Sequence, residues 1–194
     1  AHAENLAIDI CRERTRLPKT ALHILQGALP AEDAIGFKAY TSNKSGVRFM
    51  VYLYSASGGH LRAAMEGNLL GMMRTGAASG LATQLLARED AKVLGMFGSG
   101  WQAEGHLAAI LAVRKISQVK VFGRNSDKLN AFCQKMGARF GVEIIAAKSA
   151  EETVRDSDIV STITTANTPL FEASWLKEGA HVNGAGSNSL IRRE

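Results

Sequence analysis

The chain has 194 residues, of which 46% are hydrophobic and 21% charged, with 19 glycines and 3 prolines. This is the composition of an ordinary globular protein, with room for one large domain or two small ones, and no apolar run reaches the roughly 20 residues of a membrane-spanning helix. The net charge is +5, but the basic residues are scattered and aromatic residues make up only 6%. We therefore expect neither a nucleic acid nor a membrane as partner, and the charge fits a site for small anionic ligands equally well.

The two cysteines, Cys11 and Cys133, lie far apart in the sequence. This fits a reducing compartment better than a framework of disulfides. The first residues lack the basic and then apolar pattern of a signal peptide. We therefore expect a cytoplasmic protein, and we assign no metal ligands.

The first 88 residues have a mixed pattern. Residues 47–54 are rich in β-branched and aromatic residues, residues 55–59 are typical of a turn, and residues 60–66 fit a returning strand, which together predict a hairpin. Residues 69–87 then carry apolar residues at helical spacing. Two glycines within that predicted helix, Gly76 and Gly80, indicate close packing against a neighbouring element or a ligand. The apolar positions of the helix are Leu69, Met72, Met73, Leu81, Leu85 and Leu86.

From residue 91, short apolar strands alternate with amphipathic helices. This alternation indicates βαβ units and a parallel sheet with helices on both faces. We therefore predict an α/β fold, with a Rossmann-type doubly wound parallel sheet over residues 89–194 and a smaller α+β domain over residues 1–88. The predicted strands lie at 92–98, 118–124, 142–147, 158–164 and 180–186.

Residues 95–109, GMFGSGWQAEGHLAA, place three small residues where the first of these strands meets its helix. Gly98 permits a tight turn, Gly100 lets a pyrophosphate approach the backbone, and Ala103 lets the helix lie close to the strand. Free N–H groups at the start of the helix then bind phosphate. A tight turn without a ligand is the alternative, but the further strands favour a dinucleotide site.

The end of the second predicted strand bears on which dinucleotide binds. NAD sites usually have an acidic residue there for the ribose hydroxyls, whereas residues 123–125 of this chain are Gly-Arg-Asn. Arg124 suits a 2′-phosphate and the adenine, with Asn125, Ser126 or Lys128 as further donors. This favours NADP(H). NAD(H) stays open, because Asp127 lies within reach of a ribose and Arg124 is also explained as a surface residue beside a helix cap.

Two further features have more than one interpretation. Thr164 and Thr165 end the fourth predicted strand, where hydroxyls either contact the cofactor or stabilise a turn. Arg74 lies between methionines and small residues on a helix that we expect to be buried. A buried arginine needs an anionic partner, and its planar fork suits a carboxylate. Both a structural ion pair and a substrate carboxylate fit.

Six segments resemble the ornithine cyclodeaminase and mu-crystallin family in order and spacing. The resemblance implies a substrate-binding and dimerisation domain followed by a Rossmann domain, a homodimer, and hydride transfer between a nicotinamide cofactor and the α-carbon of an amino or imino acid. Family members are longer than this chain, so we expect the first domain to be incomplete at its N-terminal side and the second at its C-terminal side. The segments are GFK at 36–38, MMRTGAASGLATQLLARED at 72–90, FGSGWQAEGHLAAI at 97–110, VFGR at 121–124, DIVSTITT at 158–165 and HVNGAGSN at 181–188.

The resemblance also implies roles for single residues. Lys38 and Arg74 take the positions of the family's lysine and arginine near the substrate carboxylate, with Arg14 or Arg16 as a further arginine. Asn188 stands where the cyclodeaminases have an acidic catalytic residue. Our assignment names Lys38, Arg74 and Asn188 as catalytic, Arg14, Arg16, Lys38 and Arg74 as substrate-binding, and Thr75, Gly98, Gly100, Trp101, Gln102, Ala103, Arg124, Asn125, Thr164, Thr165 and Gly186 as cofactor-binding.

Asn188 decides between the activities of the family. An amide accepts a hydrogen bond but is not a base near neutral pH, so it cannot deprotonate the terminal amine of ornithine. We therefore predict net hydride transfer on a small amino or imino acid, as in an amino acid dehydrogenase or a ketimine reductase. The alternatives are an ornithine cyclodeaminase proper and a cofactor-dependent ligand-binding protein without turnover.

Overall fold

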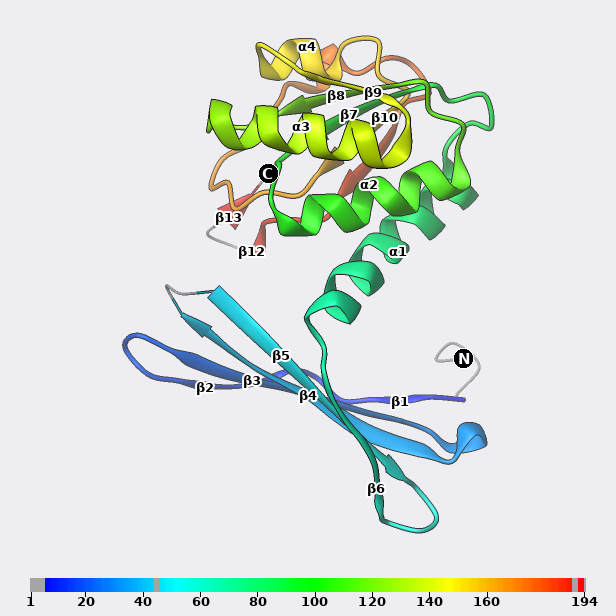
Figure 1. Cartoon of the computed structure of the whole chain (residues 1–194), viewed down its shortest axis with the longest axis vertical. Helices are drawn as coiled ribbons and strands as arrows, with labels where there is room; N and C mark the ends of the chain where they lie inside the picture. The colour runs from blue at the N-terminus through cyan, green and yellow to red at the C-terminus, as the bar shows by residue number, and fades with distance from the viewer. Residues whose placement is uncertain (1–5, 44–45, 190–191, 194) are drawn as a thin grey trace. The chain divides into compact units, whose positions relative to one another are not determined.

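The computed structural model describes residues 6–43, 46–189 and 192–193, and the chain divides into two compact units between Gly71 and Met72 (Figure 1). Each unit is built on its own sheet. None of the helices in these ranges is long and apolar enough to cross a membrane.

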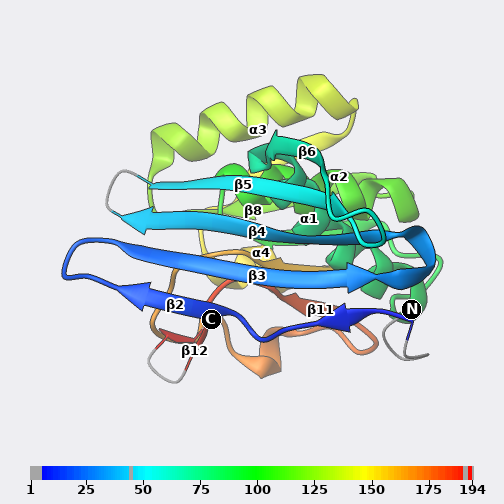
Figure 2. The same ribbon diagram turned by 90° about the horizontal axis from the view of Figure 1, so that it is seen from below.

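The first unit is an antiparallel sheet in the order β1-β3-β4-β5-β6, with β2 pairing along the same edge of β3 as β1. Figure 2 shows β2 to β6 side by side. The hairpin predicted from residues 47–66 is confirmed as β5 and β6, and β5 lies inside the sheet because β4 pairs with its other edge. The elements are β1 (Ile8–Asp9), β2 (Glu13–Arg16), β3 (Ala21–Leu29), η2 (Pro30–Glu32), β4 (Ala34–Asn43), β5 (Gly46–Ser55) and β6 (Leu61–Glu66).

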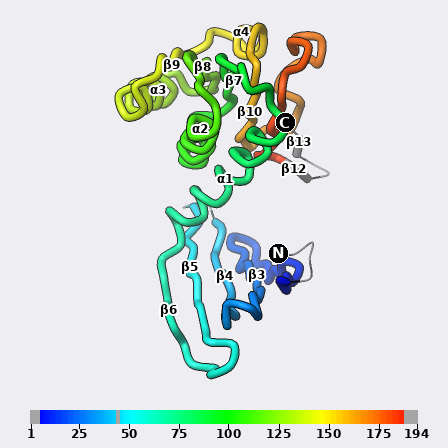
Figure 3. Tube along the Cα trace, turned by 90° about the vertical axis from the view of Figure 1, so that its right-hand side faces the viewer, coloured from blue at the N-terminus to red at the C-terminus, as the bar shows by residue number. Residues whose placement is uncertain are grey.

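The second unit is a five-stranded parallel sheet in the order β11-β10-β7-β8-β9. Its crossover helices lie on both faces, α2 and α3 on one and α4 on the other (Figure 3). The predicted α/β fold with a doubly wound parallel sheet is thereby confirmed. The elements are β7 (Val93–Phe97), α2 (Trp101–Val113), β8 (Gln118–Phe122), α3 (Ser126–Phe140), β9 (Glu143–Ala146), α4 (Ala150–Val154), β10 (Ile159–Thr162), η3 (Ala173–Trp175), β11 (His181–Gly184), β12 (Asn188–Ser189) and β13 (Arg192–Arg193).

The central strand β7 is buried on both faces. Leu94 and Met96 are fully buried in the larger core cluster, which includes Leu107 and Ile110 of α2. Phe97 belongs to a second cluster on the other face. Each of these large side chains contributes about 1.5–3 kcal/mol to folding through burial. Packing on both faces therefore holds β7 in place, and with it the start of the turn that follows.

Helix α1 (Asn68–Leu86) contacts α2 through small residues. A Cβ on Gly76 would lie 2.2 Å from the carbonyl oxygen of Gly105, and one on Gly80 would lie 2.9 Å from the Cβ of Ala109. The close packing predicted from these two glycines is confirmed, with a helix as the neighbour. The expectation that this helix is buried was wrong for most of its large apolar residues, because backbones this close leave no space for large side chains between the helices. Met72 is buried, while Leu69, Met73, Leu81, Leu85 and Leu86 are exposed.

Asp158 precedes β10 and joins three parts of the second unit. Its Oδ2 accepts hydrogen bonds from the backbone N–H groups of Lys92 (2.8 Å) and Val93 (3.0 Å), and its Oδ1 lies 2.5 Å from the Nζ of Lys177. Burial alone would raise the pKa of this carboxyl, but the bond from Lys177 and the two N–H bonds outweigh burial and lower the pKa. The ionised carboxylate therefore stabilises the fold.

We expect Asp158→Ala to lower the free energy of unfolding by about 1–3 kcal/mol at neutral pH, since it leaves an ammonium and two partly buried N–H groups without their partner. A lowered pKa gives stability that is present above the ordinary carboxyl pKa of about 4 and lost as the pH falls through the folded value. Urea unfolding should thus show a difference between wild type and variant that shrinks below pH ~4. As control, Asp90→Ala removes only an exposed pair with Arg88; equal losses in the two variants would contradict this account.

Candidate functional site

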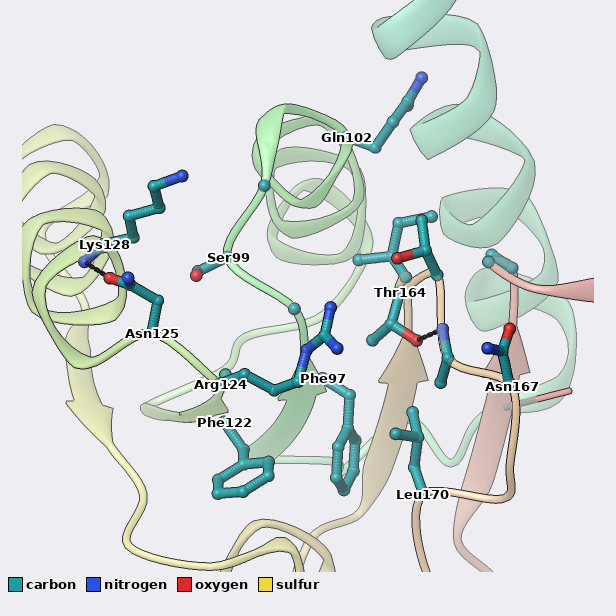
Figure 4. Close-up of a pocket in the computed structure, with 18 of the residues that line it drawn as sticks. Phe97, Ser99, Gln102, Phe122, Arg124, Asn125, Lys128, Thr164, Asn167 and Leu170 are labelled. Atoms are coloured by element: carbon teal, nitrogen blue, oxygen red, sulfur yellow. Dashed lines mark hydrogen bonds between the residues drawn. The ribbon is translucent and has the colours of Figure 1, made fainter. Parts of the chain in front are cut away.

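A cavity of about 1020 Å³ opens at the carboxyl ends of β7, β8 and β10 (Figure 4). The chain passes from β7 to β8 and β9 on one side of the sheet and returns to β10 and β11 on the other. Strand order reverses between β7 and β10, and ligands of open α/β sheets bind outside the strand ends at such a point. The cavity therefore lies where this architecture places a ligand.

The turn between β7 and α2 forms the floor of the cavity. Gly98 has a φ of +104°, its N–H donates to the carbonyl oxygen of Phe122 (2.9 Å), and a Cβ on it would lie 2.6 Å from the carbonyl oxygen of Ile163. A Cβ on Gly100 would meet nothing within 4 Å. The fold itself requires glycine at position 98, whereas at position 100 the absence of a side chain only keeps the cavity open.

The N-terminus of α2 faces this cavity. Its N-cap is Gly100, which provides no side-chain cap for the first N–H groups of the helix. Such a helix start attracts anions through its N–H groups and its dipole. In the first turn, the Oε1 atom of Gln102 is buried without a hydrogen-bond partner among the described residues, and Gln102 lines the cavity. The floor thus offers donors for an anion and an acceptor for a hydroxyl or amide.

The wall after β8 is basic. Arg124, Asn125 and Lys128 line it, and no aspartate or glutamate is among the described residues that line the cavity. In Figure 4 the side chain of Arg124 extends into the cavity from the end of β8. The Oδ1 of Asn125 accepts the backbone N–H of Lys128 at 2.9 Å and caps α3. Arg124 and Lys128 are therefore the charged groups available to a phosphate there.

The opposite wall is the segment after β10, where Thr164, Thr165 and Asn167 line the cavity. The hydroxyl of Thr164 accepts the backbone N–H of Ala166 at 3.1 Å, and its carbonyl oxygen accepts the hydroxyl of Ser187 at 3.3 Å. Thr164 therefore stabilises the turn after β10. It also lies beside the cavity, where its side chain is placed to contact a cofactor.

The cavity brings together most of the residues predicted to bind a cofactor. Trp101 and Ala103 do not line it: Trp101 is 44% exposed and Ala103 is fully buried against the sheet. Sequence reasoning missed several lining residues, although their signal was available, because Phe97 and Phe122 lie within two residues of the predicted ends of the first and second strands. The predicted residues in the lining are Thr75, Gly98, Gly100, Gln102, Arg124, Asn125, Thr164, Thr165 and Gly186.

The predicted substrate residues of the first unit share one face of its sheet. Residues directly opposite in neighbouring strands point to the same side, and Arg14 is opposite His23, which is opposite Tyr40. Lys38, two residues before Tyr40, has its Nζ 5.5 Å from the ring centroid of Tyr40 and 5.1 Å from that of Phe49. Arg16, two residues after Arg14, lies on this face as well.

Arg74 belongs to the second unit, and the prediction that it is buried was wrong. It is exposed, because α1 packs against α2 through the opposite, small-residue face. Its Nη2 donates to the Oγ1 of Thr75 at 3.2 Å, and Thr75 lines the cavity. Within the described ranges no carboxylate pairs with its guanidinium. Asn188 lies in β12, and its side chain is outside the described part of the chain.

Residues 13–194 match the ornithine cyclodeaminase/mu-crystallin family. The Delta(1)-pyrroline-2-carboxylate reductase of Bacillus cereus is 39% identical over 175 residues, which cover 87% of this chain and 53% of the relative. The ketimine reductase mu-crystallin of Mus musculus is 30% identical over 192 residues, covering 93% and 60%. The chain thus spans between half and three fifths of the length of these two relatives.

Solved structures agree with this match. The Thermococcus litoralis Delta(1)-pyrroline-2-carboxylate reductase in complex with NADH and L-proline superposes with a TM-score of 0.91 at 31% identity, covering 96% of this chain and 60% of that one. The probable ornithine cyclodeaminase from Bordetella pertussis also gives 0.91 at 31% identity, covering 100% and 61%. The glycine turn, the cavity at the strand ends and these matches lead to one conclusion. The chain belongs to the ornithine cyclodeaminase/mu-crystallin family.

Proposed function

We propose that this chain is part of an NAD(P)-dependent oxidoreductase that transfers hydride at the α-carbon of a small amino or imino acid. The observation that carries the proposal is the cavity at the switch point, with Gly100 open toward it and basic residues on one wall. Relatives named as a pyrroline-2-carboxylate reductase and a ketimine reductase, and a similar structure that holds NADH and L-proline, support the substrate class.

The residues present fit a dinucleotide. The space beside Gly100 and the start of α2 would hold the pyrophosphate, and the unpartnered Oε1 of Gln102 would accept a hydrogen bond from a hydroxyl or amide of the ligand. Thr164 and Thr165 would face its sugar or nicotinamide from the opposite wall. When bound, the nicotinamide supplies or accepts the hydride.

We propose NADP(H) as the preferred cofactor, because the wall after β8 carries Arg124 and Lys128 and lacks the carboxylate that would hold ribose hydroxyls. NADPH should bind at least about tenfold more tightly than NADH, and Arg124→Ser should remove most of that difference by weakening NADPH alone. Titration followed by nicotinamide fluorescence measures both. The control is Arg155→Ser, an exposed arginine paired with Glu151. Equal or tighter binding of NADH to the wild type would show that Arg124 does not select the 2′-phosphate.

For the substrate, we propose that Arg74 and Lys38, with Arg14 or Arg16, bind the carboxylate. The face of the first sheet that carries Lys38 has Arg14 and Arg16 on β2, and its acidic residue in the described strands is Asp9 of β1, opposite Gly27. Basic residues outnumber the acidic one on this face, which disfavours a terminal ammonium and agrees with the amide at position 188. An uncharged side chain, as in alanine or a cyclic imino acid, suits these surroundings better than ornithine.

The test is turnover by the intact protein, followed by absorbance at the nicotinamide band. We expect oxidation of NADPH with Delta(1)-pyrroline-2-carboxylate, or with keto acids plus ammonia or methylamine, and little or no proline from ornithine. Proline formed from ornithine at about 1 s⁻¹ or faster would instead support a cyclodeaminase. Tight cofactor binding without turnover on the whole panel would support a ligand-binding protein.

We also propose that the protein is a cytoplasmic homodimer that associates through the first unit. The face of its sheet opposite Lys38 has an apolar groove of about 420 Å³. Ile8 and Ile35, both in this groove, are 54% and 46% exposed. An exposed apolar groove of this kind is typical of a protein–protein interface, and a second copy of the same unit is the occupant that the family resemblance implies.

A further inference from the structure

His23 in β3 has a position that the proposed substrate contacts do not explain. It lies directly opposite Arg14 of β2 and directly opposite Tyr40 of β4. Its ring stacks on that of Tyr40, with centroids 4.4 Å apart and planes within 2° of each other. Its Nε2 lies 2.9 Å from the Oγ of Ser42. The imidazole is thus held flat on the face that carries Lys38.

The other ring nitrogen has no such contact. Nδ1 of His23 is buried and has no hydrogen-bond partner among the described residues, whereas most buried polar atoms in proteins are paired. A neutral imidazole carries one donor and one acceptor. Ser42 can satisfy only one of the two nitrogens. The Nδ1 atom therefore stays ready to bind a group that the first unit itself does not provide.

The surroundings of His23 favour its neutral form. Burial lowers its pKa most, and the nearby positive charges of Arg14, Arg12 and Arg16 lower it further. The groups on β4 that face it are Tyr40 and the ammonium of Lys38, and β5 contributes the uncharged ring of Phe49. A carboxylate bound by these cations would offset their repulsion and favour protonation of the ring.

We propose that His23 is a further substrate-contacting residue, which exchanges a proton with the α-nitrogen of the bound amino or imino acid. This inference rests on the proposed function. Arg14, opposite His23, is exposed on an edge strand, so its long side chain can move toward a carboxylate bound beside the imidazole. The carboxylate would then lie among the cations and the α-nitrogen beside the imidazole.

The proton and electron balance is simple in both directions. In reduction, imidazolium at His23 gives its Nδ1 proton to the imine nitrogen, and the α-carbon accepts hydride, with its two electrons, from the reduced nicotinamide dinucleotide. The product is the amine, and His23 is left neutral. In oxidation, neutral His23 takes a proton from the substrate ammonium, and the α-carbon loses hydride to the oxidised dinucleotide.

The first test is His23→Gln in the intact protein. Glutamine retains a hydrogen bond toward Ser42 but cannot titrate, so kcat/KM for imine reduction should fall by about 100-fold or more at neutral pH, and the limb of the pH profile due to His23 should disappear. NADPH affinity should not change. The matched control is His60→Gln, an exposed histidine of the same unit. A variant that keeps the wild-type pH profile would overturn the inference.

The second test needs no turnover. Pyridine-2-carboxylate is a planar carboxylate whose ring nitrogen accepts a hydrogen bond, as the imine nitrogen would, but whose aromatic ring does not take up the hydride. NMR can follow the imidazole of His23 while this compound binds. We expect the pKa of His23 to rise by at least about 1 on binding. An unchanged pKa at saturating probe would contradict the inference even if the enzyme is active. Absence of turnover in the wild type, with this pKa rise present, would contradict the proposed function alone.

Discussion

Replacing Gly100 with alanine is expected to leave the free energy of unfolding unchanged and to weaken dinucleotide binding at least about tenfold. The backbone at Gly100 has φ −85° and ψ −179°, which alanine adopts without strain, and the added methyl group meets no protein atom within 4 Å. The methyl instead occupies the space beside the start of α2 where we place the pyrophosphate. Urea unfolding and NADPH titration of the same sample separate the two effects.

The matched control is Gly98→Ala, two residues earlier. There φ is +104° and the Cβ would lie 2.6 Å from a backbone oxygen of Ile163, so both strain and overlap oppose the change. We expect a loss of about 1–3 kcal/mol in stability from the strained backbone alone. If Gly100→Ala also destabilised the fold, or bound NADPH as tightly as the wild type, the pyrophosphate position would be wrong.

Removing either proposed carboxylate ligand should reduce catalysis far more than cofactor binding. We expect Lys38→Met and Arg74→Met each to lower kcat/KM for imine reduction by about 100–1000-fold, a loss of about 3–4 kcal/mol of transition-state stabilisation. Lys38 is held over two aromatic rings, and the guanidinium of Arg74 lies beside Thr75 at the cavity. Steady-state kinetics with saturating NADPH measure the effect.

Two controls show what these losses mean. Lys115→Met removes an exposed charge outside the cavity lining and should have no effect on kcat/KM. Arg74→Lys keeps the charge but loses the planar fork, so activity should recover only in part. If Arg74→Lys had wild-type kinetics, two-point binding of a carboxylate by Arg74 would be excluded.

The sequence predicted the parallel sheet because its signals there are local. The strands β7, β8 and β9 are short and each is followed by a helix. The large side chains of β7 are buried on both faces, which is typical of a strand in a parallel sheet. Gly98 and Gly100 were recognisable as a turn because their spacing reflects backbone geometry. A side chain at position 98 would overlap with the backbone of Ile163, 65 residues later, whereas a side chain at position 100 would meet no protein atom within 4 Å. This difference between the two glycines became visible only in the structure.

Helix α1 shows why other predictions failed. The spacing of its apolar residues suggests that they are buried. Which face of the helix is buried depends instead on where its side chains are small enough for the neighbouring helix to pack closely. The glycines of α1 and Gly105 of α2 allow close contact between backbones, and the large apolar residues are turned away. The exposure of Arg74 follows from the same packing. No local sequence motif marks His23. It lies opposite Arg14 and Tyr40 because of the register of strands β2, β3 and β4. The hydrophobic pattern of the strands does not fix that register to the single residue.

The central claim is hydride transfer to the α-carbon of a small imino acid, and isotope transfer tests it most directly. The intact protein is incubated with Delta(1)-pyrroline-2-carboxylate and with NADPH in which deuterium replaces both hydrogens at C4 of the nicotinamide. The product is then examined by mass spectrometry and NMR. We predict proline with one deuterium, bound to the α-carbon, and one equivalent of NADP⁺. Proline without deuterium, or no oxidation of cofactor although it binds, would contradict the account.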